Sequence, residues 1–196
     1  MKHLSRCLPL ILIMHCPFSA FAEDGEPSLV TSPEAVRCAS ETDCDRDPKH
    51  LEQFITGFYS WYVDSEVRIY HLHPGSRREV PYKEKEKKLY TMLTPSFAAF
   101  IEDYERRAKL EDEVLDSDFI LHGSDYFPEW ASTAYSKAIY VDAHSARLTV
   151  YLPTPPDKKL FPPAPYCKVH VTLQPAEGTW RVAATGGDER DCSSDD

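Results

Sequence analysis

Residues 51–62 read LEQFITGFYSWY, and this stretch decides the fold of the first half of the chain. Apolar side chains recur in it at intervals of three and four residues, at Leu51, Phe54, Ile55, Phe58, Trp61 and Tyr62. That period is typical of an amphipathic helix with one buried face. Asp47 and Pro48 form a helix start signal, because aspartate caps helix N-termini and proline suits the first helical position. The pattern predicts a helix over residues 48 to about 70, ended by Pro74-Gly75.

Two more helical stretches follow. The spacing of Leu89, Met92 and Leu93 predicts a second helix over residues 83–93. Thr94 and Pro95 then repeat the cap-plus-proline signal, so a third helix is expected from there to about residue 110. Its apolar face would carry Phe97, Phe100, Ile101 and Tyr104.

The apolar period changes to 2 after Trp130, which is typical of strands. Four strands are expected, with alternate apolar residues at Tyr135, Ile139 and Val141, at Leu148, Val150 and Leu152, at Cys167, Val169, Val171 and Leu173, and at Trp180, Val182 and Ala184. Short hairpins would join the first two and the last two strands, whereas the proline-rich residues 153–165 would form a stiff, extended link. The order predicts an α+β domain, with two to three N-terminal helices packed on one face of a four-stranded antiparallel sheet.

The first 22 residues have the organisation of a secretory signal peptide. Two basic residues precede an apolar run over residues 8–14, and a small-x-small cleavage site ends at Ala22. The apolar run is too short for a permanent membrane span. We therefore expect cleavage after Ala22, a periplasmic location and no stable membrane anchor. An acidic N-terminal arm over residues 23–47, a single domain over 48–187 and a polar tail over 188–196 would remain.

Four cysteines follow the predicted cleavage site: Cys38, Cys44, Cys167 and Cys192. An even number in an exported chain predicts two disulfides, and the local pairs Cys38–Cys44 and Cys167–Cys192 are favoured among the three possible pairings. A zinc site is disfavoured, because no C-x-x-C pair occurs. His71 and His73 are close enough to share a metal, but no clear third ligand is near them. We expect no metal and no cofactor.

The chain is acidic, with 32 Asp and Glu residues against 22 Lys and Arg residues and a formal net charge of −10. This charge repels nucleic acid and anionic membrane surfaces, so neither is expected as a partner. It favours a protein partner that is basic. The candidate partner-binding residues are Asp118, Asp125, Tyr126 and Trp130, in and before an aromatic segment. Packing of the aromatic residues is the alternative, because such side chains serve both cores and interfaces.

No motif in the chain predicts catalysis. Ser124 lies between His122 and Asp125, but members of a catalytic triad come from separate elements, and no G-x-S-x-G elbow occurs. A P-loop and a dinucleotide fingerprint do not occur either. The sequence therefore predicts a protein without enzymatic activity.

Three segments resemble the DUF3828 family of small exported bacterial proteins. Residues 54–62 (FITGFYSWY) are similar to its opening helix, residues 118–130 (DFILHGSDYFPEW) to its middle motif, and residues 178–182 (GTWRV) to its closing strands. The resemblance implies an α+β fold similar to the cystatin-like and NTF2-like group, export to the bacterial envelope and no established reaction. Ser124 stands where relatives often carry glutamine, and the chain lacks the lipoprotein signal of many relatives.

These observations favour a periplasmic protein-binding module, most concretely an immunity or inhibitor protein against a toxin that acts in the periplasm. The inserted surface would be the proline-rich link or the loop over residues 123–130. A structural accessory of an envelope complex is one alternative. Another is an NTF2-like pocket protein that binds or converts a small ligand, and it requires that Phe58, Trp61 and Phe100 do not fill the space between helices and sheet.

Overall fold

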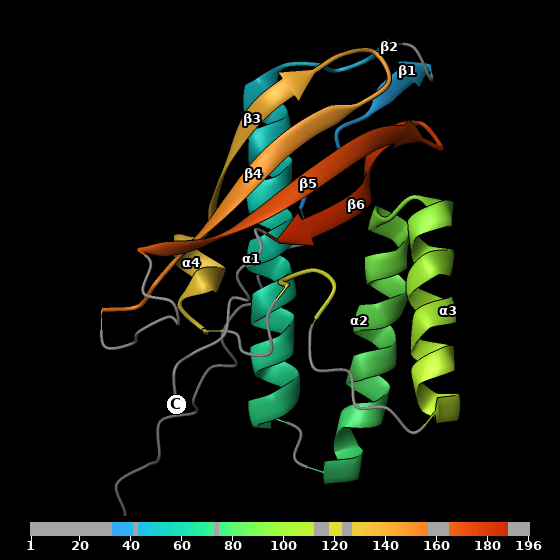
Figure 1. Ribbon diagram of the computed structural model, residues 1–196, viewed down its shortest axis with the longest axis vertical. Helices are drawn as coiled ribbons and strands as arrows, with labels where there is room; N and C mark the ends of the chain where they lie inside the picture. The colour runs from blue at the N-terminus through green and yellow to red at the C-terminus, as the bar shows by residue number, and fades with distance from the viewer. Residues whose placement is uncertain are drawn as a thin grey trace, which may run out of the picture.

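The computed structural model describes residues 33–40, 43–72, 75–111, 118–122, 127–156 and 165–187 (Figure 1). Its elements are β1 (Cys38–Ser40), β2 (Asp43–Cys44), α1 (Pro48–Leu72), a 3-10 turn (Gly75–Arg78), α2 (Glu79–Met92), α3 (Pro95–Glu111), α4 (Trp130–Thr133), β3 (Tyr135–Val141), β4 (Ala146–Pro153), β5 (Tyr166–Ala176) and β6 (Thr179–Gly187). Helices precede a four-stranded antiparallel sheet, so the predicted α+β class is confirmed. The predicted signal peptide and polar tail lie outside the described residues.

The sheet is a meander in the order β3-β4-β5-β6, and each strand is antiparallel to its neighbour. Alternate residues of the two central strands are fully buried on the face that α1 covers, as predicted; they include Leu148, Val150, Leu152, Val169 and Leu173. The edge of β6 is partly covered, because Leu93 and Arg37 each form a bridge to it. β3 forms the other edge of the sheet (Figure 1).

β3 departs from the predicted pattern, in which Tyr135, Ile139 and Val141 share one face. Tyr135 is 41% exposed and Ile139 is 66% exposed, whereas Val141 is half-buried and packs against the core. A bulge between Ala138 and Tyr140 explains the difference, since an extra residue reverses the alternation of the side chains. Ser136 is the residue of β3 that is buried.

α1 lies across one face of the sheet and contacts β3, β4, α2 and α4 (Figure 1). Its N-terminus is capped as predicted, because the Lys49 N–H donates to Asp47 Oδ1 at 2.9 Å. Polar groups fix it to β3: the Ser136 hydroxyl donates to the carbonyl of Glu52 at 2.7 Å, and the Ala138 N–H donates to the Glu52 carboxylate at 2.8 Å. The sheet is therefore held to the helix by hydrogen bonds as well as by apolar packing.

α2 and α3 form a helical hairpin on the β6 side of α1 (Figure 1). α2 begins four residues earlier than predicted, directly after the 3-10 turn. α3 begins at Pro95, and Thr94 Oγ1 accepts the N–H of Phe97 at 3.4 Å, as its cap signal predicts. The predicted apolar face of α3 is only partly buried, because Phe100 is 50% exposed and Tyr104 is 39% exposed. Both rings contact Phe119 edge-on.

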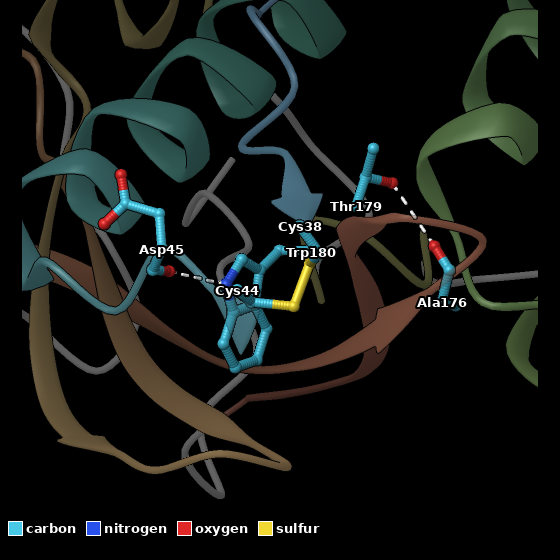
Figure 2. Close-up of a disulfide and its surroundings, with 6 residues drawn as sticks. All are labelled: Cys38, Cys44, Asp45, Ala176, Thr179 and Trp180. Carbon is cyan, nitrogen blue, oxygen red and sulfur yellow. Dashed lines mark hydrogen bonds between the residues drawn. A yellow bond between two sulfur atoms is a disulfide. The ribbon is translucent and has the colours of Figure 1, made fainter. Parts of the chain in front are cut away.

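The predicted disulfide between Cys38 and Cys44 is confirmed and joins β1 to β2 (Figure 2). The hairpin is bound to the β5–β6 turn, because the Cys38 N–H donates to the Gly178 carbonyl at 2.8 Å. Just beyond it, the Trp180 indole N–H donates to the carbonyl of Asp45 at 2.7 Å (Figure 2). Cys167 is also disulfide-bonded, and its predicted partner Cys192 lies outside the described residues.

Replacing both Cys38 and Cys44 with serine should lower the free energy of unfolding by about 2 kcal/mol. The reason is that a crosslink with a sequence separation of 6 restricts the unfolded chain only modestly. Urea denaturation of the oxidised proteins measures the difference. The exposed Ala39→Ser change keeps the crosslink and serves as the control. Equal stability of the double variant and the control would show that the disulfide contributes nothing.

Candidate functional site

Trp130, one of the four predicted partner-binding residues, belongs to the core. Its side chain is fully buried, its indole N–H donates to the carbonyl of Pro153 at 2.8 Å, and its ring meets that of Phe127 with centroids 4.9 Å apart. The packing alternative for this tryptophan is therefore the one that the structure supports. Asp125 and Tyr126 lie outside the described residues.

Asp118, another predicted contact residue, fastens the turn at residues 118–121 to α1. One carboxylate oxygen accepts the N–H groups of Ile120 at 2.6 Å and Leu121 at 2.9 Å, and the other accepts the Tyr62 hydroxyl at 2.5 Å. Burial, together with the nearby charge of Asp118, raises the pKa of Tyr62 well above its usual value. Tyr59 adds a second tie, because its hydroxyl donates to the carbonyl of Ile120 at 2.9 Å. These contacts give Asp118 a structural role.

A buried ion pair lies beside this turn. Lys85 of α2 donates to the carboxylate of Glu66 on α1, and the two side chains are 7% and 9% exposed. The Lys85 ammonium also lies 3.8 Å from the centroid of the Tyr62 ring. Burial lowers the pKa of Lys85 to about 8, although Asp118 and other nearby carboxylates favour the charged form. Because the pair is almost closed to solvent, it joins two helices and does not present a group to a ligand.

The burial of Lys85 could have been predicted from the sequence. Lys85 precedes Leu89 by four residues and Met92 by seven, so helical spacing places it on the apolar face of α2. All three residues are buried. A lysine in such a stripe needs a buried partner, since an isolated charge away from water is costly.

Within the described residues, the histidines singled out in the sequence do not form a site with the other candidate residues. His71 is exposed at the end of α1, and His73 lies outside the described residues. His122 Nε2 lies 3.0 Å from Thr185 Oγ1, whereas Ser124 and Asp125 are outside the described part. Within the described ranges, no group of three His, Cys, Asp or Glu residues is placed to hold a metal. No helix there is long and apolar enough to cross a membrane.

The alternative of a small-ligand pocket required that Phe58, Trp61 and Phe100 leave the space between helices and sheet open. Phe58 and Trp61 are buried, whereas Phe100 is half exposed on α3. Surface depressions among the described residues lie elsewhere. One of about 500 Å³ includes Asp45 and His50, whose carboxylate and imidazole are 2.5 Å apart, and one of about 410 Å³ lies between α2 and α3. Neither lies between the helices and the sheet.

The outer side of β3 and β4 exposes aromatic, apolar and basic side chains. We call it the β3–β4 face and define it by six residues: Tyr135, Lys137, Ile139 and Tyr140 of β3, with Arg147 and Tyr151 of β4. The rings of Tyr135 and Tyr151 stack 4.9 Å apart with an 8° angle between their planes. The Arg147 guanidinium lies 5.8 Å from the Tyr140 ring centroid.

The negative charge of the chain is distributed unevenly between the described residues and the rest of the sequence. The described residues contain 18 Asp and Glu against 17 Lys and Arg, so their charges almost balance. Most of the excess negative charge therefore belongs to residues outside the described part. The six residues of the β3–β4 face include two cations and no carboxylate. This finding weakens the argument for a basic partner.

Lys85→Met should lower the free energy of unfolding by about 3 kcal/mol at pH 7, because it leaves the buried Glu66 without its partner. The double variant Glu66→Leu with Lys85→Met should recover most of that loss, since it removes both charges. Chemical denaturation of the set measures these differences. Lys87→Met, at an exposed position of the same helix, is the control and should change little. A double variant as unstable as the single one would contradict this account.

The stability of the wild-type protein should rise relative to Lys85→Met as the pH increases from about 8 towards 10. The pKa of Lys85 is about 8 in the folded protein and 10.5 for an ordinary lysine. Between these values the unfolded chain binds more protons, so a higher pH favours the folded state. Urea denaturation of both proteins across this range measures the difference. A constant difference would show that the Glu66 carboxylate keeps Lys85 charged.

The chain matches no protein-family model, no curated protein and no solved structure, and the resemblance to the DUF3828 family stays a prediction.

Proposed function

We propose that this protein is an extracytoplasmic protein-binding module that contacts its partner through the β3–β4 face. One observation carries the proposal. Tyr135, Ile139 and Tyr140 are 41%, 66% and 47% exposed, so β3 presents three large apolar or aromatic side chains within seven residues. Tyrosine and arginine are enriched among the residues that dominate binding energy at protein interfaces, and the face combines both.

The face is pre-organised for binding. β3 is held to α1 through Glu52 and Thr56, the latter accepting the Ser136 N–H at 3.1 Å. On the outer side, the Tyr151 ring stacks on Tyr135 and meets Tyr166 edge-on, with centroids 5.1 Å apart. Side chains that are already ordered lose little conformational entropy when a partner binds.

The cellular location that we propose for this protein is the periplasm. The Cys38–Cys44 disulfide is consistent with an oxidising, extracytoplasmic compartment. The predicted signal peptide over residues 1–22 is a further argument for export. In its most concrete form, the proposal is an inhibitor or immunity protein against a toxin that acts in that compartment.

The proposed surface differs from the two that the sequence suggested. Trp130 is buried. The rest of the aromatic loop, at residues 123–126, lies outside the described residues, and so does most of the proline-rich link. An outer sheet face is a sound alternative, because its large side chains come from a rigid scaffold.

A photo-crosslinking amino acid at position 139 should capture one defined protein in cells that export the full chain. The same amino acid at position 80 is the matched control, because Ile139 and Val80 are both 66% exposed but lie on different elements. Mass spectrometry of the adducts identifies the partner. Equal adducts at both positions, or none at 139, would overturn the proposal.

The purified partner then allows the affinity to be measured. Ile139→Asp should weaken binding tenfold or more, because it places a charge in the centre of an apolar contact, whereas Val80→Asp should have no effect. An enzyme that loses activity on binding would support the inhibitor form. A subunit of an envelope assembly would support the structural accessory instead.

A further inference from the structure

We infer that the part of the partner that docks on the β3–β4 face is an extended protein segment rich in aspartate and glutamate. This inference rests on the proposed function and names the chemistry of its partner. It reverses the expectation of a basic partner that the net charge of the chain suggested.

Two cations on the face lack a carboxylate partner among the described residues. Lys137 and Arg147 are exposed and take part in no ion pair there. Some other basic side chains of the described part are paired, such as Arg68 with Asp64 at 2.8 Å and Lys83 with Glu79 at 2.7 Å. The exposed Lys49 and Lys87 form no ion pair there either, but they lie apart from each other, on α1 and α2. The β3–β4 face is thus a place where the described body offers positive charge to a partner.

The nearest acidic residue at the end of β3 is already engaged. Asp142 accepts the Tyr140 hydroxyl at 2.5 Å and the N–H groups of His144 and Ser145 at 2.7 Å. These hydrogen bonds orient its carboxylate towards its own turn. A carboxylate from a partner is therefore the complementary group for Lys137 and Arg147.

The spacing of the cations fits an extended segment. Lys137 pairs in register with Thr149, and Arg147 lies two residues from Thr149 along β4. The two cations are therefore offset by about 7 Å along the strand direction and by one strand across it. Alternate side chains of an extended peptide are also about 7 Å apart, so carboxylates at positions i and i+2 match this offset.

The tyrosines complete the complementarity. The stacked pair Tyr135 and Tyr151 lies on one side of Lys137 along the strands, and Tyr140 lies on the other side beside Arg147. Apolar side chains that flank the carboxylates of the partner would pack on these rings, and Ile139 offers further apolar surface between them.

A single-stranded nucleic acid also stacks on aromatic side chains, but the charge of the molecule opposes it. Binding along a phosphate backbone requires a continuous basic groove, and this chain carries a net charge of −10. A short acidic segment carries fewer charges and needs only the local cations. The observations therefore favour a protein segment.

Fluorescence anisotropy with the full-length, oxidised protein tests the inference. The probe is a labelled decapeptide in which glutamate alternates with serine. It should bind, and the affinity should fall as salt rises. The variant Lys137→Gln with Arg147→Gln should weaken binding at least tenfold. Lys49→Gln with Lys87→Gln makes the same change in net charge at exposed positions elsewhere and should leave the affinity unchanged. Equal melting temperatures would show that both variants are folded.

Three results would overturn the inference: an equal loss of affinity in the control variant, no binding of the glutamate peptide, or equal binding of a lysine peptide or of a ten-nucleotide oligothymidine. These failures are separate from failure of the proposed function. If position 139 still captures its partner and Lys137→Gln with Arg147→Gln leaves that capture unchanged, the interface stands and only its acidic chemistry is wrong.

Discussion

The burial of α1 on two sides is the constraint on which the rest of the structure depends. Trp61 and Val63 are both buried although they lie two positions apart, on opposite sides of the helix, and the sheet, α2 and α4 all contact α1. Burial also encloses polar groups that require partners. The carbonyl of Ile120 satisfies the Tyr59 hydroxyl, and Lys85 satisfies Glu66. These requirements position the turn at residues 118–121 and α2 relative to the central helix.

Sequence patterns predicted the elements well where one periodicity acts alone. The Asp47 cap, the stripe that begins at Leu51, and the alternation in β4 and β5 all report burial directly. The pattern failed in β3, because a bulge adds a residue without leaving a mark in the alternation. The surface proposed for binding was missed for a different reason: Tyr135 and Ile139 are aromatic or apolar, and the pattern assigns such residues to the core although both are exposed.

The predicted site residues illustrate what composition alone cannot decide. Trp130 has a side chain suited to an interface or to a core, and only the fold shows that its indole N–H reaches the carbonyl of Pro153. The net charge misled in another way, since a sum over the chain does not say where charges lie.

β3 is also an edge strand with exposed apolar residues, and it carries Lys137 and a bulge, two features by which edge strands avoid pairing with other chains.

The near balance of charge across the described residues also affects how copies of the molecule approach one another. Long-range repulsion between two neutral bodies is weak, so the colloidal stability of this protein at neutral pH depends mainly on carboxylates in the remaining sequence. Divalent cations that bind those carboxylates would remove this repulsion without changing the protonation of the buried groups. Self-association of folded molecules would then begin under conditions in which every helix and strand is still intact.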